Sequence, residues 1–420
     1  MALTEEIARQ PAAPGRWLSI VGIGEEGVDG LNAEAKALIQ SAAVVFGGGR
    51  HLELAATLIR GTALPWIRPF ERNVPEILAN RGRAVCVLAS GDPFQHGIGS
   101  ILSRHVASEE TVAIPTASAF TLAASRLHWS LPQCVLLSLC GRSHDFIRPH
   151  LQPGARILIL TSDGAAPAAL AGLLSELGFG SSRITVLEAL GGSAERVRAS
   201  SARNFDCADI NPLNTLAVEV EAAPGARILY RAAGLPDDLF EHDGQITKHE
   251  VRALTLSALA PRRYEHLWDV GAGCGSVAIE WLLADVSLRA VAIERRPERA
   301  ARIARNAAAF GVPDLQVVQA SAPAGFSGLP APDAIFVGGG ATTPGLLSAV
   351  REALRPQGRL VVNAVSLETE AVLLHHYSQL GGTLTRLAVS RAGAIGGAEA
   401  RMSGWRPAMP VSQWVWMKKS

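Results

Sequence analysis

Short apolar runs rich in β-branched residues alternate with Ala- and Leu-rich stretches along the chain. In the first half this pattern predicts strands over residues 17–21, 42–46, 84–88, 135–139, 156–160 and 184–187. Short apolar strands that alternate with helical stretches are typical of β-α units, in which helices cover both faces of a sheet. The pattern therefore predicts an α/β fold.

A second series of strands follows a charged stretch with several Gly and Pro residues that begins after Val220. Such a stretch is typical of a linker, so we expect a domain boundary near Ala222, between domains of residues 1–222 and 223–420. Beyond it the pattern predicts seven strands, over residues 266–270, 288–294, 315–319, 333–337, 359–365, 383–391 and 413–417. Helices are expected to begin near Gly275, Pro297, Pro344 and Leu367.

Composition fits a folded protein of two domains. The 420 residues are 48% hydrophobic and 18% charged, and the net charge is +1. A chain this close to neutral lacks the broad basic field with which proteins bind nucleic acids or anionic membranes. We therefore expect neither of these partners, although a local basic pocket is compatible with the overall charge.

The cysteines and the first residues bear on cellular location. Five cysteines form no C-x-x-C pair, so we expect neither a disulfide framework nor a metal site; they are Cys86, Cys134, Cys140, Cys207 and Cys274. Residues 1–14 are acidic, are interrupted by proline and have no apolar core, which does not fit a signal peptide. The longest apolar runs are too short to cross a bilayer. These features predict a cytoplasmic, reduced protein.

A glycine-rich turn lies between a predicted strand and a predicted helix in LWDVGAGCGSVAIEW. Gly271, Gly273 and Gly275 have the spacing G-x-G-x-G, and glycines here let a ligand approach the backbone. The dinucleotide fingerprint would place its third glycine at the position of Ser276. The compact spacing favours S-adenosylmethionine (SAM) over NAD as the cofactor.

Two acidic residues extend this candidate cofactor site. Asp269 lies near the end of the strand before the loop, and Glu294 ends the next strand, 23 residues after Gly271. A carboxylate at the end of the second strand can accept hydrogen bonds from both hydroxyls of a ribose. The purely structural alternative is a glycine-rich turn beside a surface glutamate, with no cofactor bound to either.

The fourth strand of this half ends in Gly338, Gly339 and Gly340, beside the position where substrates bind in sheets of this type. Methylases of amide or exocyclic amine nitrogens usually carry an Asn/Asp-Pro-Pro-aromatic run there, which this chain lacks. The sequence therefore predicts a substrate site with a different methyl acceptor. A flexible loop without a binding role is the alternative.

The segment DGQITKHEVRA precedes a predicted helix and contains a second candidate group. Thr247 and Glu250 have the spacing of a capping box, which is a purely structural alternative. Lys248 is harder to explain structurally, because only four of the 39 basic residues are lysines. Where arginine is so strongly preferred, a lysine suggests a chemical role.

Three further residues could supply positive charge for an acidic substrate. These are His249, Arg252 and Arg401. Taken singly, each fits better as a solvated surface charge.

The first half contains a glycine pattern that suggests the wrong cofactor. Gly22, Gly24 and Gly27 match G-x-G-x-x-G, but NAD would also require an acidic residue at the end of the second strand, where three glycines stand instead. Glu25 and Glu26 would repel a pyrophosphate. NAD is therefore not expected here.

Further along the first half, Gly91-Asp92-Pro93 forms a turn directly after a predicted strand.

Both halves resemble known families. Residues 17–220 are similar to the tetrapyrrole (uroporphyrinogen/corrin) methylases through VGIGEEG, LASGDPFQHGIG, IPTASAFTLAASRL, LSLCGR and LTSDGAAPAALA. Residues 240–420 are similar to the Rossmann-type corrin methyltransferases through DGQITKHEVRALTL, LWDVGAGCGSVAIEW, IERRPERAARIARNA and PDAIFVGGG. The resemblance implies a tetrapyrrole-methylase domain of two α/β subdomains, followed by a seven-stranded Rossmann-like domain. Two departures concern substrate contacts: Cys140 where relatives often have histidine, and Gln95-His96 where they have a more aromatic pair.

The resemblance also implies a SAM site in each half. In the first half it places Ser90, Gly91 and Asp92 along the SAM trough, Ser118 and Ala119 at the methionine end, and Leu139, Cys140 and Gly141 at the adenosine side. In the second half Gly271, Gly273 and Gly275 would wrap the methionine portion, Glu294 would hold the ribose, and Thr247 would cover the pocket.

The implied activity is SAM-dependent methylation of a precorrin in cobalamin biosynthesis. The first half would methylate carbon 5, and the second would methylate carbon 15 and release the ring C acetate carboxyl as carbon dioxide, giving precorrin-8X. Lys248, with Thr247 beside it, is the candidate to orient a substrate carboxylate or to supply a proton. Arg50 and His51 are candidates to bind carboxylates in the first half.

Two other classes of protein stay open on the sequence. An RNA or protein methyltransferase is disfavoured by the neutral charge and the lack of a basic tail. A non-catalytic tetrapyrrole-binding protein is disfavoured by the presence of two SAM-type motifs. Both resembled families self-associate, so a homo-oligomer is expected.

Overall fold

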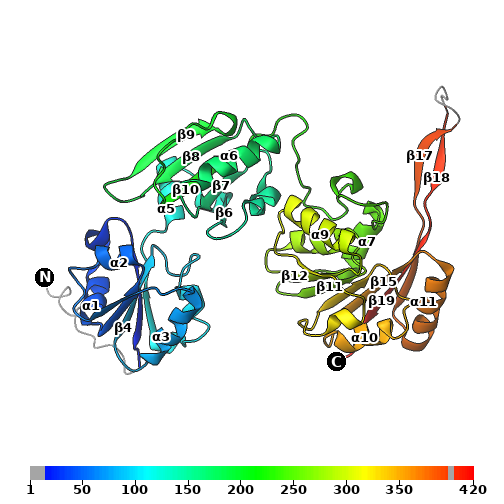
Figure 1. Cartoon of the computed structure of the whole chain (residues 1–420), viewed down its shortest axis with the longest axis horizontal. Coiled ribbons are helices and arrows are strands. Elements are labelled where there is room, and N and C mark those ends of the chain that lie inside the picture. Colours follow the sequence, from blue (N-terminus) through cyan, green and yellow to red (C-terminus); the bar gives the residue numbers. More distant parts are fainter. Residues whose placement is uncertain (1–14, 396–401) are drawn as a thin grey trace. The chain divides into compact units, whose positions relative to one another are not determined.

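The computed structural model describes residues 15–395 and 402–420, so residues 1–14 and the candidate cation Arg401 lie outside the described residues. The chain divides into two compact units, each of which is described by itself (Figure 1). The first unit runs to Arg142 and resumes over His150–Arg227, and the second contains Ser143–Pro149 and Ile228–Ser420. No helix within the described ranges has both the length and the apolar character needed to cross a bilayer.

The first unit begins with a five-stranded parallel sheet of order β3-β2-β4-β1-β5. Its strands are β1 (Leu18–Ile23), β2 (Val44–Gly47), β3 (Thr62–Pro65), β4 (Val85–Ser90) and β5 (Thr111–Ile114). Its helices are α1 (Ala33–Ser41), α2 (Gly49–Leu54), α3 (Asn73–Ala79) and α4 (Gly99–Leu102). Successive residues of β1 and β4 enter opposite cores: Ile20 and Val87 belong to one cluster, Val21 and Leu88 to the other. Continuous apolar strands are therefore explained by a sheet that is buried on both faces.

A second sheet of this unit has the order β6-β7-β10-β8-β9 and is mostly antiparallel. Its strands are β6 (Cys134–Ser138), β7 (Arg156–Leu160), β8 (Arg183–Glu188), β9 (Arg196–Ser201) and β10 (Asn214–Glu219). Two longer helices belong to it, α5 (Ala119–Leu127) and α6 (Ala166–Glu176). The two α/β subdomains expected for the first half are confirmed.

The second unit contains a seven-stranded sheet of order β13-β12-β11-β14-β15-β19-β16, in which only β19 is antiparallel to its neighbours. The strands are β11 (His266–Val270), β12 (Arg289–Ile293), β13 (Gln316–Val318), β14 (Ala334–Val337), β15 (Arg359–Ala364), β16 (Thr383–Leu387) and β19 (Val411–Met417). The helices are α7 (His249–Leu259), α8 (Ser276–Ala284), α9 (Pro297–Ala309), α10 (Leu346–Ala353) and α11 (Leu367–Leu380). The predicted seven-stranded Rossmann-like sheet is confirmed.

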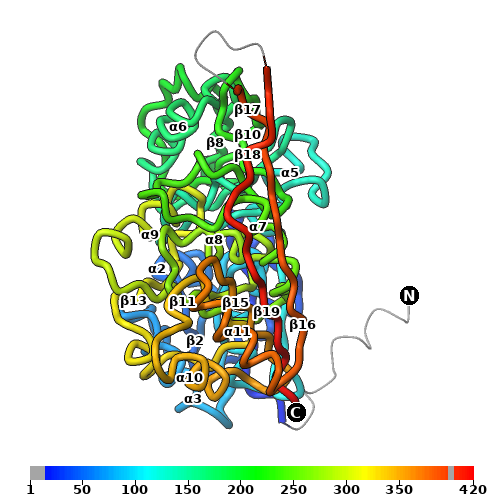
Figure 2. The backbone as a smooth tube through the Cα atoms, turned by 90° about the vertical axis from the view of Figure 1, so that its right-hand side faces the viewer, coloured from blue at the N-terminus to red at the C-terminus, as the bar shows by residue number. Residues whose placement is uncertain are grey.

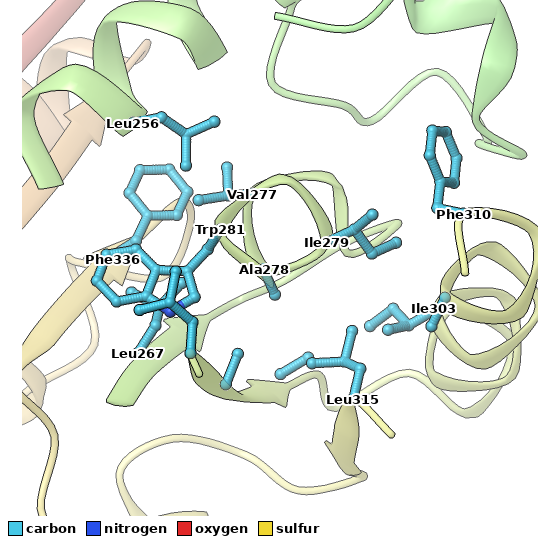
Figure 3. Close-up of a cluster of buried hydrophobic side chains, with 14 of the residues drawn as sticks. Leu256, Leu267, Val277, Ala278, Ile279, Trp281, Ile303, Phe310, Leu315 and Phe336 are labelled. Carbon is cyan, nitrogen blue, oxygen red and sulfur yellow. The ribbon is translucent and has the colours of Figure 1, made fainter. Parts of the chain in front are cut away.

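Helix α8 fills the core on one face of this sheet. Its side chains Ile279 and Trp281 belong to one buried cluster with residues of the sheet and with Ile303 of α9 (Figure 3). The Trp281 side chain is fully buried, and its indole Nε1 donates to the Arg289 carbonyl at 3.0 Å. The start of α8, which follows the glycine loop directly, is thus held by one of the largest buried side chains of the unit.

The strand predicted over residues 383–391 is wrong in its second half. The sheet strand β16 ends at Leu387, and β17 (Ser390–Ile395) pairs instead with β18 (Met402–Pro407) as a separate antiparallel ribbon. This ribbon extends beyond the seven-stranded sheet of its own unit (Figures 1 and 2). Its strands combine glycine and polar residues, among them the facing pair Gly393 and Gly404, and lack the alternation of a half-buried strand. For that reason the pattern did not predict it.

Arg252 on α7 is also placed differently from the prediction of a solvated surface charge. Its side chain is fully buried, and its Nε donates to Glu280 of α8 at 2.6 Å. One Nη donates to Asp237 at 3.1 Å and to the Thr247 carbonyl, and the other donates to the Leu235 carbonyl. A guanidinium without water must find partners for all of its N–H groups, and here these partners come from three separate segments.

We expect Arg252→Met to destabilise the second unit, because it leaves Glu280 buried without its cation. Loss of one partner of a buried ion pair costs about 3–5 kcal/mol. Urea unfolding of the full chain, followed by tryptophan fluorescence, should show this loss in the transition of the second unit. Arg305→Ala, which breaks an exposed ion pair with Glu241, serves as the matched control and should shift the transition far less. Equal shifts for the two variants would contradict the assignment.

Candidate functional site

The second unit contains a pocket of about 460 Å³ beside the carboxyl ends of β11 and β14. It collects six of the residues singled out in the sequence: Thr247, Lys248, Gly271, Gly273, Gly338 and Gly339. These residues come from three separate loops, which the parallel strands bring to the same edge of the sheet. Gly340 does not line the pocket.

The glycine turn after β11 forms one wall of this pocket. Gly271 and Gly273 have φ angles of 70° and 61°, which favour glycine. A Cβ atom on Gly271 would lie 3.0 Å from the Gly339 carbonyl oxygen, so the loops after β11 and β14 approach each other closely. Gly275 has a different role: it stands before α8 and faces Ile303 of α9, and it does not line the pocket.

Glu294 is tied to the glycine turn. One of its carboxylate oxygens accepts a hydrogen bond from the Gly273 amide at 3.0 Å, and the other accepts one from the Arg296 amide at 3.0 Å. The side chain is buried and does not line the pocket. In this arrangement Glu294 fixes the turn, and its contact with a ribose stays a prediction.

Asp269 lies below the same turn and is 1% exposed. Its Oδ2 accepts a hydrogen bond from the Ala278 amide at 3.1 Å, whereas Oδ1 has no partner among the described residues. Burial, with a smaller contribution from the charge of Glu294, raises the pKa of Asp269 to about 7. A buried carboxylate oxygen without a partner beside a glycine turn fits a ligand that carries positive charge. SAM is such a ligand.

The segment before α7 covers the pocket without the predicted capping box. The helix begins at His249, its N-cap residue is Lys248, and no side chain caps it. The Thr247 carbonyl accepts a hydrogen bond from Arg252, which lies in the first turn of the helix. The Lys248 Nζ lies 3.8 Å from Asp237, and 45% of its side chain is exposed.

Three polar residues that line the pocket were missed in the sequence. Arg299 on α9 donates to Asp243 at 2.8 Å. Asn363, near the carboxyl end of β15, is oriented by hydrogen bonds with Thr255 and Gln413. Arg391 belongs to the unpredicted ribbon. Asn363 could have been predicted, because it is a polar residue in the otherwise apolar end of a strand. No local pattern in the sequence indicates that Arg391 lies at this pocket.

The first unit has a smaller cavity of about 50 Å³, lined by four of the predicted residues: Arg50, Ser90, Gly91 and Ala119. Gly91 has a φ angle of 59°, and a Cβ atom there would lie 2.9 Å from the Ala117 carbonyl oxygen. The turn after β4 thus lies against the start of α5, and only glycine fits at that contact.

Two further predicted residues of the first unit support this turn from outside the cavity lining. Asp92 accepts a hydrogen bond from the Phe94 amide at 2.8 Å, and Ser118 caps α5 by accepting from the Thr121 amide at 3.1 Å. Both side chains have local structural roles here, and direct contact with a cofactor stays a prediction.

The predicted turn of Leu139, Cys140 and Gly141 is connected to the cavity indirectly. The Cys140 thiol lies 3.2 Å from the Thr161 carbonyl oxygen, and the Thr161 hydroxyl donates to Asn214, which lines the cavity. None of the three turn residues lines the cavity itself.

The two basic candidates of the first unit differ in charge. Arg50 lines the cavity and forms an ion pair with Glu25. Burial and the neighbouring Arg50 lower the pKa of His51 to about 4. His51 is therefore neutral at pH 7 and could bind a carboxylate only through a neutral N–H group, so its contact with the substrate stays a prediction. Within residues 15–395 and 402–420 no cluster of His, Cys, Asp or Glu has the arrangement of a metal site.

Comparison with family models gives one match in each half. The tetrapyrrole (corrin/porphyrin) methylases match residues 18–206, and the precorrin methyltransferase domain matches residues 238–418. The second match covers every residue that lines the larger pocket, and the first covers most of those that line the smaller cavity.

Whole-chain relatives are known as well. A Sinorhizobium precorrin-6Y C(5,15)-methyltransferase [decarboxylating] is 59% identical over 97% of this chain and 98% of its own. A Mycobacterium tuberculosis protein of the same name is 41% identical over 95% of this chain and 99% of its own. A Salmonella typhimurium cobalt-precorrin-6B C(15)-methyltransferase (decarboxylating) is 37% identical over 35% of this chain and 77% of its own.

The raised pKa of Asp269 predicts a specific pH dependence of stability. In the unfolded chain this carboxyl titrates near pH 4, so the folded state binds its proton more tightly. The resulting stability is fully present below about pH 4 and is lost as the pH rises through about 7. Between pH 5 and pH 8, the free energy of unfolding of the wild type should fall relative to that of Asp269→Asn by about 2–3 kcal/mol. A difference between the two proteins that does not change with pH would contradict this prediction.

Proposed function

We propose, from the premise that the chain belongs to the precorrin-6Y C(5,15)-methyltransferases (decarboxylating), that each half holds one SAM and performs one of the two methylations. The enzyme is a SAM-dependent methyltransferase of cobalamin biosynthesis that methylates a precorrin and decarboxylates it. We assign carbon 5 to residues 1–222, and carbon 15 with the decarboxylation to residues 223–420.

One observation carries this assignment. The pocket of the second unit combines a glycine turn tied to a buried acidic residue with three cations, Lys248, Arg299 and Arg391. A methyl donor and an anionic methyl acceptor therefore find complementary groups in a single pocket. The existence of a separate relative named for C(15) methylation with decarboxylation supports placing both steps in one domain.

The residues of the second pocket fit SAM. Gly271 and Gly273 would lie along its methionine portion, Glu294 holds the turn that contacts it, and Asp269 lies buried behind that turn with one oxygen unpartnered among the described residues. When bound, SAM supplies a methyl group on a positively charged sulfur. The main contribution of the pocket is alignment, which can lower a barrier by about 7–11 kcal/mol.

The chemistry at the substrate needs no strong base. A π electron pair of the macrocycle forms the new bond at carbon 15, while the bond between methyl carbon and sulfur breaks. The bond to the acetate carboxyl of ring C then breaks, carbon dioxide leaves, and the electron pair moves into the conjugated system that methylation has made electron-poor. A proton added to the remaining methylene carbon completes a methyl group. Among the described residues Glu250 is the only carboxylate that lines the pocket, and Arg391 engages it, in agreement with a mechanism without a carboxylate base.

The cavity of the first unit supports the second SAM site. Ser90, Gly91 and Ala119 line it, as does Arg50, which would have to exchange its ion pair with Glu25 for a substrate carboxylate. Alignment would again be the main contribution, since the acceptor carbon of the macrocycle is already electron-rich.

Titration with S-adenosylhomocysteine tests the two-site proposal. We expect calorimetry of the full chain to give a stoichiometry of two. Gly273→Arg should reduce it to one, because the new side chain enters the second pocket. Ser90→Arg should remove the other site in the same way. A wild-type stoichiometry of one, or a stoichiometry of two in either variant, would contradict one site per half.

Lys248→Ala tests the role of the lysine in the second pocket. Lys248 is proposed to orient a substrate carboxylate or to donate the final proton, so both carbon 15 methylation and decarboxylation should slow by at least about tenfold, the effect of one charged hydrogen bond. Product analysis by mass spectrometry measures both steps. Lys36→Ala, which changes another lysine in the first half, should leave them unaffected. Normal rates of both steps in Lys248→Ala would rule out the role.

A further inference from the structure

Arg391 is the polar group through which the β17–β18 ribbon enters the pocket of the second unit. It is the second residue of β17, and it lines the pocket together with Glu250 of α7. The two are far apart in sequence, so their contact exists only because the ribbon lies across the start of α7. The proposed function counts Arg391 among the cations of the pocket but gives it no specific contact.

The guanidinium of Arg391 is held along one edge only. Its Nε donates to one oxygen of Glu250 at 3.0 Å, and its Nη2 donates to the other oxygen at 2.5 Å. Nη2 also lies 3.4 Å from Nδ1 of His249. Within the described residues Nη1 has no hydrogen-bond partner, and 49% of the side chain is exposed. One edge of a planar, fully charged donor fork is therefore fixed, and another is free for a ligand.

The pocket that Arg391 lines also has apolar walls. Leu387, Val389, Met409 and Val411 are among its lining residues. Ionic hydrogen bonds are stronger beside apolar walls than in water, because the local dielectric constant is lower. The other two cations of the pocket, Lys248 and Arg299, have partners that do not line it, Asp237 and Asp243.

We propose that Arg391 binds a carboxylate of the precorrin substrate and that Glu250 positions it for this contact. The proposal rests on the proposed function and specifies how the second half recognises its substrate. A carboxylate oxygen can accept a charge-assisted hydrogen bond from Nη1 of the guanidinium, which is unpartnered among the described residues. The ion pair with Glu250 keeps the Arg391 guanidinium from rotating out of the pocket.

The carboxylate bound by Arg391 is one that stays on the product. Decarboxylation moves the negative charge of the reacting acetate into the macrocycle, and a contact with arginine would stabilise the starting carboxylate and oppose that movement. Arg391 therefore contributes to binding and orientation, and its loss should affect both steps of the second half together.

Steady-state kinetics on the full-length enzyme test the proposal, with precorrin-6Y and SAM as substrates. Arg391→Ala should raise the KM for the macrocycle by roughly 10- to 100-fold, the effect of losing one charge-assisted contact. The ratio of carbon 15 methylation to carbon dioxide release should stay at the wild-type value, as should the affinity of both sites for S-adenosylhomocysteine. Glu250→Gln, which keeps the arginine and one acceptor oxygen, should raise KM less. Arg386→Ala is the control, because Arg386 pairs with Glu370 on the exposed surface away from the pocket.

Two results would overturn the proposal. If Arg391→Ala and Glu250→Gln raise KM equally, the ion pair only secures the ribbon. If Arg391→Ala loses decarboxylation but keeps methylation, the arginine acts on the reacting acetate. A wild-type enzyme that does not convert precorrin-6Y would instead refute the proposed function, so the two failures are distinguishable.

Discussion

The buried guanidinium of Arg252 is the interaction on which the site of the second unit depends. A charge without water is tolerated only if each N–H finds a partner, and Arg252 finds its partners in Glu280 of α8, in Asp237 and in two backbone carbonyls. The same contacts that satisfy the charge fix the segment before α7 against the helix that follows the glycine turn. The cofactor side and the substrate side of the pocket are thereby held in one geometry.

The groups around the pocket that Arg252 stabilises differ in charge. Two acidic residues, Asp269 and Glu294, are buried behind the glycine turn, and the cations Lys248 and Arg391 line the pocket itself. A polycarboxylate acceptor would meet groups of opposite charge in this pocket.

Local patterns in the sequence predicted the α/β class, the seven-stranded sheet and the glycine turn, because each depends on spacing within a few tens of residues. The burial of Arg252 was not predictable, since its partners lie on another helix and in a loop before α7. Arg391 escaped prediction because its ribbon lacks the alternation of a buried strand. The burial of His51, which lowers its pKa to about 4, likewise depends on contacts that the local sequence does not show. Interactions that require three-dimensional contact account for each of these misses.

The central claim is that the two halves divide the two methylations. It is tested most directly by the position of the transferred methyl group in an enzyme whose second pocket is blocked at Gly273. Precorrin-6Y and SAM with a ¹³C-labelled methyl group would be supplied, and the product examined by carbon NMR. The account predicts one labelled methyl group, at carbon 5, and an intact ring C acetate. A label at carbon 15, or release of carbon dioxide, would contradict it.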